Sequence, residues 1–403
     1  MPAATPPRTI GRRTALRRLA AMGAALPLVA LGLACNDGEE LASTTTDAVP
    51  APHQDTPPDA ASIAALGAVG VPIASTPAVA ARISRAASET VEVDLDTVDA
   101  SDPVAGGAVH INPVVATNCP DPGVYEEGGV YYMVCTTHVL PAFPIRTSND
   151  LVNWTQTGEY VFTSANKPVW ADDHFWAPEI HRVSGRYVLY YTARNRSTNT
   201  LCIGVATSAS PTGPYTDIGE PLISEEVAAL DASFFADDDG RQYLYWKADA
   251  AWRDPSGPIW VQELSADGLA LVGSRSAVLR SDLEWEGRLV EAPQVAKRDG
   301  RYYLFYSGGK FDTPSYAVGV ARSFSPIGGF VKKGDPILRT GGRWKGPGHG
   351  SVVAYEGDAY MLYHAWEGEQ FVDVRQCLLD RIAWTDEGWP LVNDGTPSEP
   401  DQT

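Results

Sequence analysis

The fold is decided by a short stretch, GRYVLYY at residues 185–191, in which a turn glycine precedes an alternating strand rich in aromatic residues. The same pattern occurs four more times, as GGVYYMV at 128–134, GRQYLYW at 240–246, GRYYLFY at 300–306 and GDAYMLY at 357–363. The five glycines are 55 to 60 residues apart, which leaves room for four strands and their loops in each repeat.

The repeat predicts an all-β fold, a five-bladed β-propeller with four antiparallel strands per blade, over residues 109–397. A two-domain α/β fold is disfavoured, because no long segment with a 3.6-residue hydrophobic period separates the strands. We expect the protein to be a monomer.

The composition is that of a globular protein, with 44% hydrophobic and 20% charged residues among 403. The formal net charge is −19, so the chain is strongly acidic. Nucleic acids and anionic membrane surfaces require basic patches, and we therefore expect neither as the main partner. An uncharged ligand such as a sugar is compatible with this charge.

Residues 1–34 are predicted to be an export signal, because five arginines precede an Ala- and Leu-rich stretch too short for a comfortable membrane span. GRRTALR at 11–17 resembles a twin-arginine signal, which implies export of the folded protein. LGLAC at 31–35 resembles a lipoprotein box, which makes Cys35 a candidate for a lipid anchor. Small residues at Gly32 and Ala34 also suit an ordinary signal peptidase, and Cys35 is then a plain thiol. The predicted location is periplasmic, cell-surface or secreted.

Residues 35–108 are dominated by small and polar residues and contain no Trp, Tyr or Phe. Such a composition cannot bury a core, and it predicts a flexible tether between an anchor and the propeller. We expect no function in this segment.

A polar residue lies six to nine positions before each repeat glycine: Asp121, Glu179, Asp231, Glu291 and His349. The first strand of every propeller blade lines the central channel, and all five run in the same direction. Equivalent positions therefore surround one mouth of the channel, where carboxylates are close enough to shift each other's pKa. Hydrolysis of a glycosidic bond needs one carboxylic acid and one carboxylate, and the repeat supplies such groups.

The sequence around these positions resembles glycoside hydrolase family 43. Its motifs stand in the family's order: PDPGV at 120–124, FWAPEI at 175–180, LDASFF at 230–235, VEAPQV at 290–295 and GPGHGS at 346–351. The resemblance implies that Asp121 is the general base, Glu291 the general acid, and Asp231 the carboxylate that orients the acid and keeps its pKa high. The apolar neighbours of Glu291 also favour a raised pKa.

Four further residues are candidate substrate contacts. Trp176 and Phe175 can stack on the apolar face of a sugar ring at the mouth, or can pack in the core. The family resemblance treats the position of Glu179 mainly as a binding or structural polar group, and both roles stay open. Arg343 can bind substrate hydroxyls or close a loop.

His349 is a candidate substrate and metal contact. The resemblance implies that it lies in the central channel near a bound ion, often calcium held largely through water. A calcium site is rich in oxygen ligands, so one histidine does not establish it, and no His/Cys spacing is typical of zinc. We expect the chemistry to need no cofactor, and a structural calcium ion in the channel stays an open prediction.

Four cysteines follow Cys35: Cys119, Cys135, Cys202 and Cys377. If the first hairpin turns about Glu127, Cys119 lies directly opposite Cys135, and a cross-strand disulfide fits an oxidising compartment. Cys202 and Cys377 fall in blades that are not neighbours, so we expect both to be buried thiols.

The leading hypothesis is an inverting hydrolase of α-L-arabinofuranosyl linkages in plant cell-wall poly- or oligosaccharides, with β-xylosyl linkages next and β-galactosides third. Carboxyl groups facing each other on a ring of five blades are expected to be too far apart for the roughly 5 Å of a retaining pair, whereas about 6.5 to 9.5 Å admits the attacking water. A sugar-binding propeller without catalysis is a different class, but it would lack one of the three carboxylates.

Overall fold

The structure is a computed structural model, and it describes residues 95–97, 110–225, 228–249, 256–369, 371 and 374–399. In these residues, twenty strands form five four-stranded antiparallel sheets, and each sheet consists of four strands consecutive in sequence. The predicted five-bladed β-propeller is therefore confirmed. The predicted export signal, Cys35 and the predicted tether apart from 95–97 lie outside the described residues.

The blades follow one another along the chain. The first blade contains β1 (Gly123–Glu127), β2 (Val130–Val134), β3 (Ala142–Ser148) and β4 (Thr155–Phe162). The second contains β5 (Trp176–Val183), β6 (Arg186–Asn195), β7 (Thr200–Ser208) and β8 (Thr216–Asp217). The third contains β9 (Ala228–Ala236), β10 (Gln242–Asp249), β11 (Ile259–Leu264) and β12 (Leu271–Leu279). The fourth contains β13 (Val290–Arg298), β14 (Arg301–Gly308), β15 (Ala317–Ser323) and β16 (Val331–Lys332). The fifth contains β17 (Trp344–Tyr355), β18 (Asp358–Glu367), β19 (Gln376–Trp384) and β20 (Pro390–Val392).

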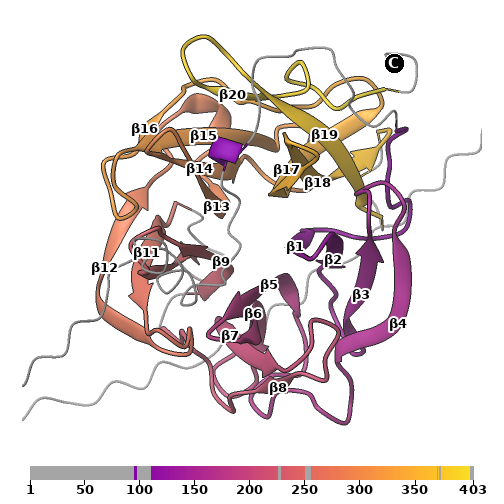
Figure 1. Cartoon of the computed structure of the whole chain (residues 1–403), viewed down its shortest axis with the longest axis vertical. Coiled ribbons are helices and arrows are strands. Elements are labelled where there is room, and N and C mark those ends of the chain that lie inside the picture. Colours follow the sequence, from indigo (N-terminus) through magenta and orange to yellow (C-terminus); the bar gives the residue numbers. More distant parts are fainter. Residues whose placement is uncertain are drawn as a thin grey trace, which may run out of the picture. The chain divides into compact units, whose positions relative to one another are not determined.

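The first strand of each blade lies nearest the propeller axis, and the later strands lie progressively further out (Figure 1). Each repeat glycine lies in the turn between the first and second strand, with a positive φ of 62° to 84° at its five occurrences. Glycine adopts this left-handed backbone without the steric cost that a Cβ atom adds. The repeat is thus a hairpin signal, and the aromatic run after it forms the second strand.

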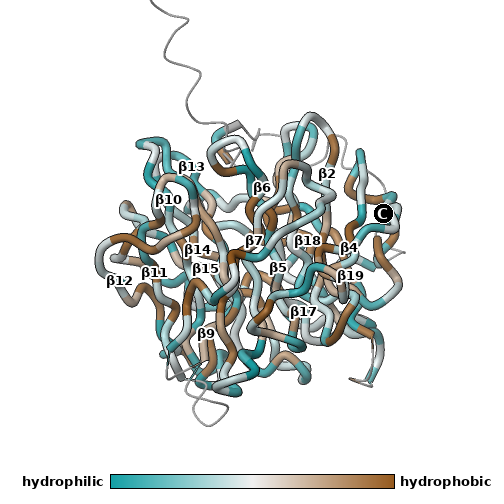
Figure 2. The backbone as a smooth tube through the Cα atoms, turned by 90° about the horizontal axis from the view of Figure 1, so that it is seen from below, coloured by the Kyte–Doolittle hydropathy of each residue, from teal (hydrophilic) through white to brown (hydrophobic). Residues whose placement is uncertain are grey.

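The hydrophobic core is divided among the five junctions between neighbouring blades. Figure 2 shows hydrophobic residues along the strands and hydrophilic residues concentrated in the loops at the ends. The tyrosines of the repeat connect the blades, because their rings are buried while their hydroxyls reach backbone carbonyls of a neighbouring blade. The bonds run from Tyr131 to Ala354, from Tyr190 to Gly268, from Tyr245 to Pro326 and from Tyr303 to Gly388.

The ring is closed by the segment that precedes β1. Val115 exchanges two backbone hydrogen bonds with Cys377 on β19, at 3.1 and 3.0 Å. The Asn112 side chain accepts the N–H of Leu379 and donates to the carbonyl of the same residue. The segment at the start of the domain therefore pairs with the last blade and holds the first and fifth blades together. Each blade still consists of four consecutive strands.

A 3-10 turn, η1 (Leu95–Thr97), lies within the predicted tether and contacts the propeller. Leu95 is fully buried in the cluster between the fourth and fifth blades, next to Tyr303 and Phe305. Asp96 accepts the backbone N–H of Asp299 in the turn between β13 and β14. This part of the segment therefore contributes to the core. Among the described residues, no helix is long and apolar enough to cross a membrane.

Candidate active site

Each blade has one non-glycine residue with a positive φ on its inner strand or, in the first blade, two residues before it: Asp121, Ala177, Asp231, Ala292 and His349, with φ between 42° and 57°. Register shifts interrupt the pairing near these positions in the second to fifth blades. A bulge of this kind re-aims the local side chains, and it costs about 1–3 kcal/mol of backbone strain at each such residue. The repeated distortion turns polar side chains toward the channel mouth.

A pocket of about 580 Å³ opens at this mouth, within the roughly 300–1,000 Å³ usual for ligand sites. All five blades contribute to its lining, and Asp121, Asp231 and Glu291 line it together. The structure therefore brings the three predicted catalytic carboxyls into one site.

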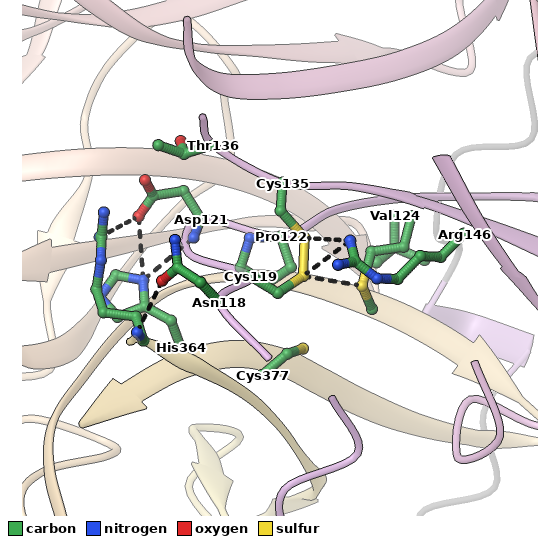
Figure 3. Close-up of a disulfide and its surroundings, with 12 residues drawn as sticks. Asn118, Cys119, Asp121, Pro122, Val124, Cys135, Thr136, Arg146, His364 and Cys377 are labelled. Carbon is green, nitrogen blue, oxygen red and sulfur yellow. Dashed lines mark hydrogen bonds and ion pairs between the residues drawn. A yellow bond between two sulfur atoms is a disulfide. The ribbon is translucent and has the colours of Figure 1, made fainter. Parts of the chain in front are cut away.

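Asp121 is buried and bonded through one oxygen only. Its Oδ1 accepts the Arg375 guanidinium at 2.8 Å and lies 3.5 Å from His349 Nδ1. The same oxygen lies 3.0 Å from His364 Nδ1 (Figure 3). In the described part of the chain, Oδ2 has no hydrogen-bond partner. Burial works to raise the pKa of Asp121, but Arg375 and the two histidines outweigh it and hold that pKa well below the usual range. Asp121 is thus a carboxylate with one oxygen fixed and one available.

Asp231 has the opposite environment. Its Oδ2 accepts the backbone N–H of Ala292 at 3.0 Å, and its own N–H donates to Thr192. Burial, and then the negative charge of Asp121, raise the pKa of Asp231.

Glu291 is also set to keep a proton. Its Oε1 accepts the Tyr316 hydroxyl at 2.8 Å, and among the described residues no hydrogen bond involves Oε2. Burial, and then the charge of Asp231, raise the pKa of Glu291 to about 7. The site therefore pairs one carboxylate that ionises readily with two that resist ionisation, which is the division of roles that acid–base catalysis requires.

Trp176 lines the pocket as predicted, together with two histidines that sequence reasoning missed. Its indole N–H donates to His138 Nδ1 at 3.1 Å, and its ring lies 4.6 Å from that of His174. His138 lies four residues after β2 and His174 two residues before β5, outside the repeat, so no periodic signal marked them. The three rings form an aromatic wall on the side of the first two blades.

Three predicted substrate contacts lie elsewhere. Phe175 is fully buried among Phe143, Phe162 and Tyr191 and does not line the pocket, so it is a core residue, contrary to the prediction of a sugar contact. Phe175 and Trp176 are adjacent in an extended chain, and their side chains point in opposite directions.

Glu179 and Arg343 do not line this pocket either. Glu179 contacts the His181 ring at 3.0 Å and accepts the N–H of Phe234, which ties β5 to β9. Arg343 donates to the Asn112 carbonyl at 2.7 Å and lies 3.5 Å from Glu399. Both fit the structural alternative, with Arg343 joining the two ends of the domain.

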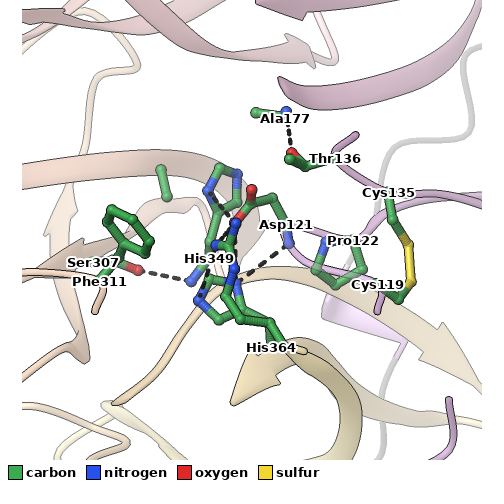
Figure 4. A network of polar contacts seen from close by, with 12 residues as sticks. Cys119, Asp121, Pro122, Cys135, Thr136, Ala177, Ser307, Phe311, His349 and His364 are labelled. Carbon is green, nitrogen blue, oxygen red and sulfur yellow. Dashed lines mark hydrogen bonds and ion pairs between the residues drawn. A yellow bond between two sulfur atoms is a disulfide. The ribbon is translucent and has the colours of Figure 1, made fainter. Parts of the chain in front are cut away.

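His349 lines the pocket, and its backbone N–H donates to Ser307 (Figure 4). Calcium prefers six to eight oxygen ligands. No group of three or more His, Cys, Asp or Glu suited to a metal occurs in the described residues, and Asp121, the carboxylate beside His349, is engaged by Arg375. These side chains do not form a calcium site by themselves, and an ion held through water stays a prediction.

The predicted disulfide between Cys119 and Cys135 is confirmed, with Cα atoms 5.1 Å apart, and it lies beside Asp121 (Figure 3). The predicted register was wrong. Gly123 pairs with Val134, so the hairpin turns between Gly128 and Gly129 and not about Glu127. The left-handed Asp121 then breaks the ladder and brings Cys119 back to Cys135. The other two cysteines, Cys202 and Cys377, are buried free thiols as expected.

Arg375, His364 and Tyr316 complete the site and were not predicted. None lies on an inner strand: Arg375 directly precedes β19, His364 lies on β18, and Tyr316 directly precedes β15. A search for equivalent positions in the repeat therefore could not find them.

Comparison with known proteins agrees with this geometry. A family model described as glycosyl hydrolases family 43 matches residues 110–390. An extracellular exo-α-(1→5)-L-arabinofuranosidase of Cellvibrio japonicus is 29% identical, over 68% of this chain and 86% of its own length. A xylosidase/arabinosidase of Butyrivibrio fibrisolvens is 30% identical, over 70% of this chain and 56% of its own length.

Among solved structures, a thermostable family-43 glycoside hydrolase superimposes with a TM-score of 0.67 at 31% identity, over 72% of this chain and 97% of that chain. The fold, the three carboxyls and both kinds of comparison lead to one assignment. The chain belongs to family 43 of the glycosyl hydrolases.

Proposed function

We propose that the protein hydrolyses α-L-arabinofuranosyl or β-xylosyl linkages of plant cell-wall poly- or oligosaccharides and inverts the anomeric centre. The observation that carries this proposal is that three carboxyls in one pocket have different surroundings. Asp121 contacts Arg375 and two histidines, which lower its pKa, whereas burial raises the pKa values of Glu291 and Asp231. Inversion is the course that membership of family 43 implies.

The bonding of each carboxyl assigns its task. Asp121 Oδ1 is held by Arg375, so Oδ2 is the oxygen that removes a proton from water as the water oxygen bonds to the anomeric carbon. Glu291 Oε1 is held by Tyr316, so Oε2 carries the proton that passes to the leaving oxygen as the glycosidic bond breaks. Asp231 delays the ionisation of Glu291 by its charge.

The sugar specificity is supported by the relatives, whose names describe an arabinofuranosidase and a xylosidase/arabinosidase. Within the aromatic wall formed by Trp176, His138 and His174, the Trp176 indole offers a flat ring face on which a pentose ring can stack. Replacing Trp176 with Ala should therefore raise KM more than it lowers kcat.

The test is a panel of aryl α-L-arabinofuranosides, β-xylosides and β-galactosides together with debranched arabinan, with NMR of the first sugar released. We expect hydrolysis of a pentoside and release of the inverted anomer. Retention of configuration, or exclusive action on galactosides, would contradict the proposal. Glu291→Gln should lower the rate on poor leaving groups about 10²- to 10⁴-fold, and much less on activated aryl glycosides.

We also propose that the chain is exported and anchored by a lipid on Cys35. Support comes from the arginine-rich, apolar segment before Cys35 and from the extracellular relative. Expression of the full chain in a bacterial host, followed by membrane fractionation, tests this proposal. Wild type should sediment with membranes and Cys35→Ala should be released, whereas a soluble wild type would exclude the anchor.

A further inference from the structure

A stacked pair of side chains, Tyr316 and His364, contacts both the general acid and the general base. Their rings are 5.7 Å apart and nearly parallel, at 10°. The Tyr316 hydroxyl donates to Oε1 of Glu291 at 2.8 Å. His364 Nδ1 lies 3.0 Å from Oδ1 of Asp121, and Figure 4 shows these two residues side by side. On each carboxyl, the pair contacts the oxygen that the chemistry does not use.

Both rings are enclosed, since Tyr316 is 1% exposed and His364 is 0% exposed. They come from neighbouring blades, and the inner strand β17 passes beside them. At Gly348 on this strand, a Cβ atom would lie 2.2 Å from Tyr316 Cε1, a distance that real Cβ atoms do not reach. Glycine at this position therefore lets the Tyr316 ring lie against the backbone of β17.

His364 contacts Asp121 and Arg375 through its two ring nitrogens. Its Nδ1 accepts the backbone N–H of Asp121 at 3.3 Å and lies 3.0 Å from Oδ1 of the same residue. Its Nε2 lies 3.5 Å from Arg375 Nη1. Burial, and then Arg375, lower the pKa of His364 to about 4, which keeps the ring neutral near pH 7. The neutral imidazole thus links Arg375 to Asp121 without adding charge.

We propose that Tyr316 and His364 are positioning residues that act as one unit, in which the stacked rings hold Glu291 and Asp121 at a fixed separation across the bond to be cleaved. The inference rests on the hydrolase function proposed above. An inverting reaction needs a water between the base and the sugar and a proton on the far side, so the separation of the two carboxyls is itself a catalytic requirement. A misplacement of about 1 Å can cost about 10²-fold in rate.

Two substitutions at Tyr316 separate its hydroxyl from its ring. Tyr316→Phe keeps the stack and removes only the bond to Glu291, so kcat on poor leaving groups should fall about tenfold to a hundredfold, with little change on activated aryl glycosides. Burial and then Asp231 raise the pKa of Glu291, whereas the Tyr316 hydroxyl, Lys247 and His349 lower it. Loss of the bond from Tyr316 should therefore raise the pKa of Glu291 further. The alkaline limb of kcat/KM should therefore move to higher pH.

Tyr316→Leu removes the stack as well. Activated aryl glycosides need little protonation, so their hydrolysis reports on Asp121 and its water. On these substrates Tyr316→Leu should be at least about tenfold slower than Tyr316→Phe at unchanged KM, because His364 loses the ring that holds it against Asp121. Should Tyr316→Leu not fold, His364→Phe keeps an aromatic ring in place of the imidazole and removes the bond to Asp121, and it should slow both classes of substrate.

A matched control is Tyr190, which is fully buried, stacked on Phe234 at 13° and bonded through its hydroxyl to Gly268, and which does not line the pocket. Tyr190→Phe and Tyr190→Leu should lower Tm without any dependence of the rate on the leaving group. If wild type is active and Tyr316→Phe and Tyr316→Leu hydrolyse activated substrates at equal rates, the inference about the stacked pair is overturned and the proposed function is not. Absence of pentoside hydrolysis by wild type would overturn the proposed function, and the inference with it.

Discussion

Glu291→Gln is expected to stabilise the folded protein at neutral and alkaline pH while it removes the general acid. The folded state raises the pKa of Glu291 from 4.5 to about 7, chiefly through burial and then through Asp231. A carboxyl with a raised pKa binds more protons in the folded than in the unfolded state between these two values, so stability is lost as pH rises through them. At about 1.4 kcal/mol for each tenfold change in acidity, the loss amounts to about 3 kcal/mol above pH 7.

Glutamine removes this loss, because it has no charge and its amide oxygen can still accept the Tyr316 hydroxyl. Urea unfolding of wild type and Glu291→Gln should therefore give similar free energies at about pH 4, and a variant more stable by about 3 kcal/mol at about pH 8. Glu387→Gln, at an exposed turn residue, is the matched control and should show no such dependence. A Glu291→Gln variant no more stable than wild type at about pH 8 would refute the argument that Glu291 is held protonated by its surroundings.

Three further outcomes are expected. Asp121→Asn should be nearly inactive on both activated and poor substrates, because water activation is lost whichever group leaves, and a variant that keeps most of its rate in a steady-state assay would contradict the assigned role. Reduction of the bond between Cys119 and Cys135, separated by 16 residues, should lower the free energy of unfolding by about 3 kcal/mol, measured in urea with and without reductant. Leu95→Ala should cost about 2–5 kcal/mol, and a chain as stable as wild type would show that η1 contributes nothing to the core.

The repeat predicts the five blades and the inner strands, because glycine at a tight turn and aromatic residues on a buried strand are both local requirements. It also places four carboxyls and one histidine at equivalent positions, and the family resemblance selects the three catalytic carboxyls among them. The exact register is not local in this way. Asp121 has a φ of 54°, and this single left-handed residue moves Cys119 relative to the ladder that begins at Gly123. The residue type does not predict the left-handed conformation of Asp121, since aspartate is also common in ordinary turns.

The directions in which the adjacent side chains of Phe175 and Trp176 point could not be predicted from the sequence either. The motif FWAPEI suggested two aromatic contacts with sugar, yet Phe175 packs in the core and Trp176 faces the pocket. Alternation along an extended chain makes one of the two point inward, but the sequence does not say which, because both are large and apolar.

The roles of Asp121 and Asp231 show how a symmetric scaffold acquires asymmetric chemistry. Both are buried aspartates on or just before inner strands, with φ of 54° and 57°, so the repeat makes them equivalent. Arg375, which directly precedes β19, is hydrogen-bonded to Asp121 and holds the pKa of that carboxyl down. Among the described residues, the Asp231 carboxyl accepts one hydrogen bond, from a backbone N–H, and burial and then the charge on Asp121 raise its pKa. One cation from the fifth blade therefore acts on the general base directly and on the second aspartate through the charge of the base.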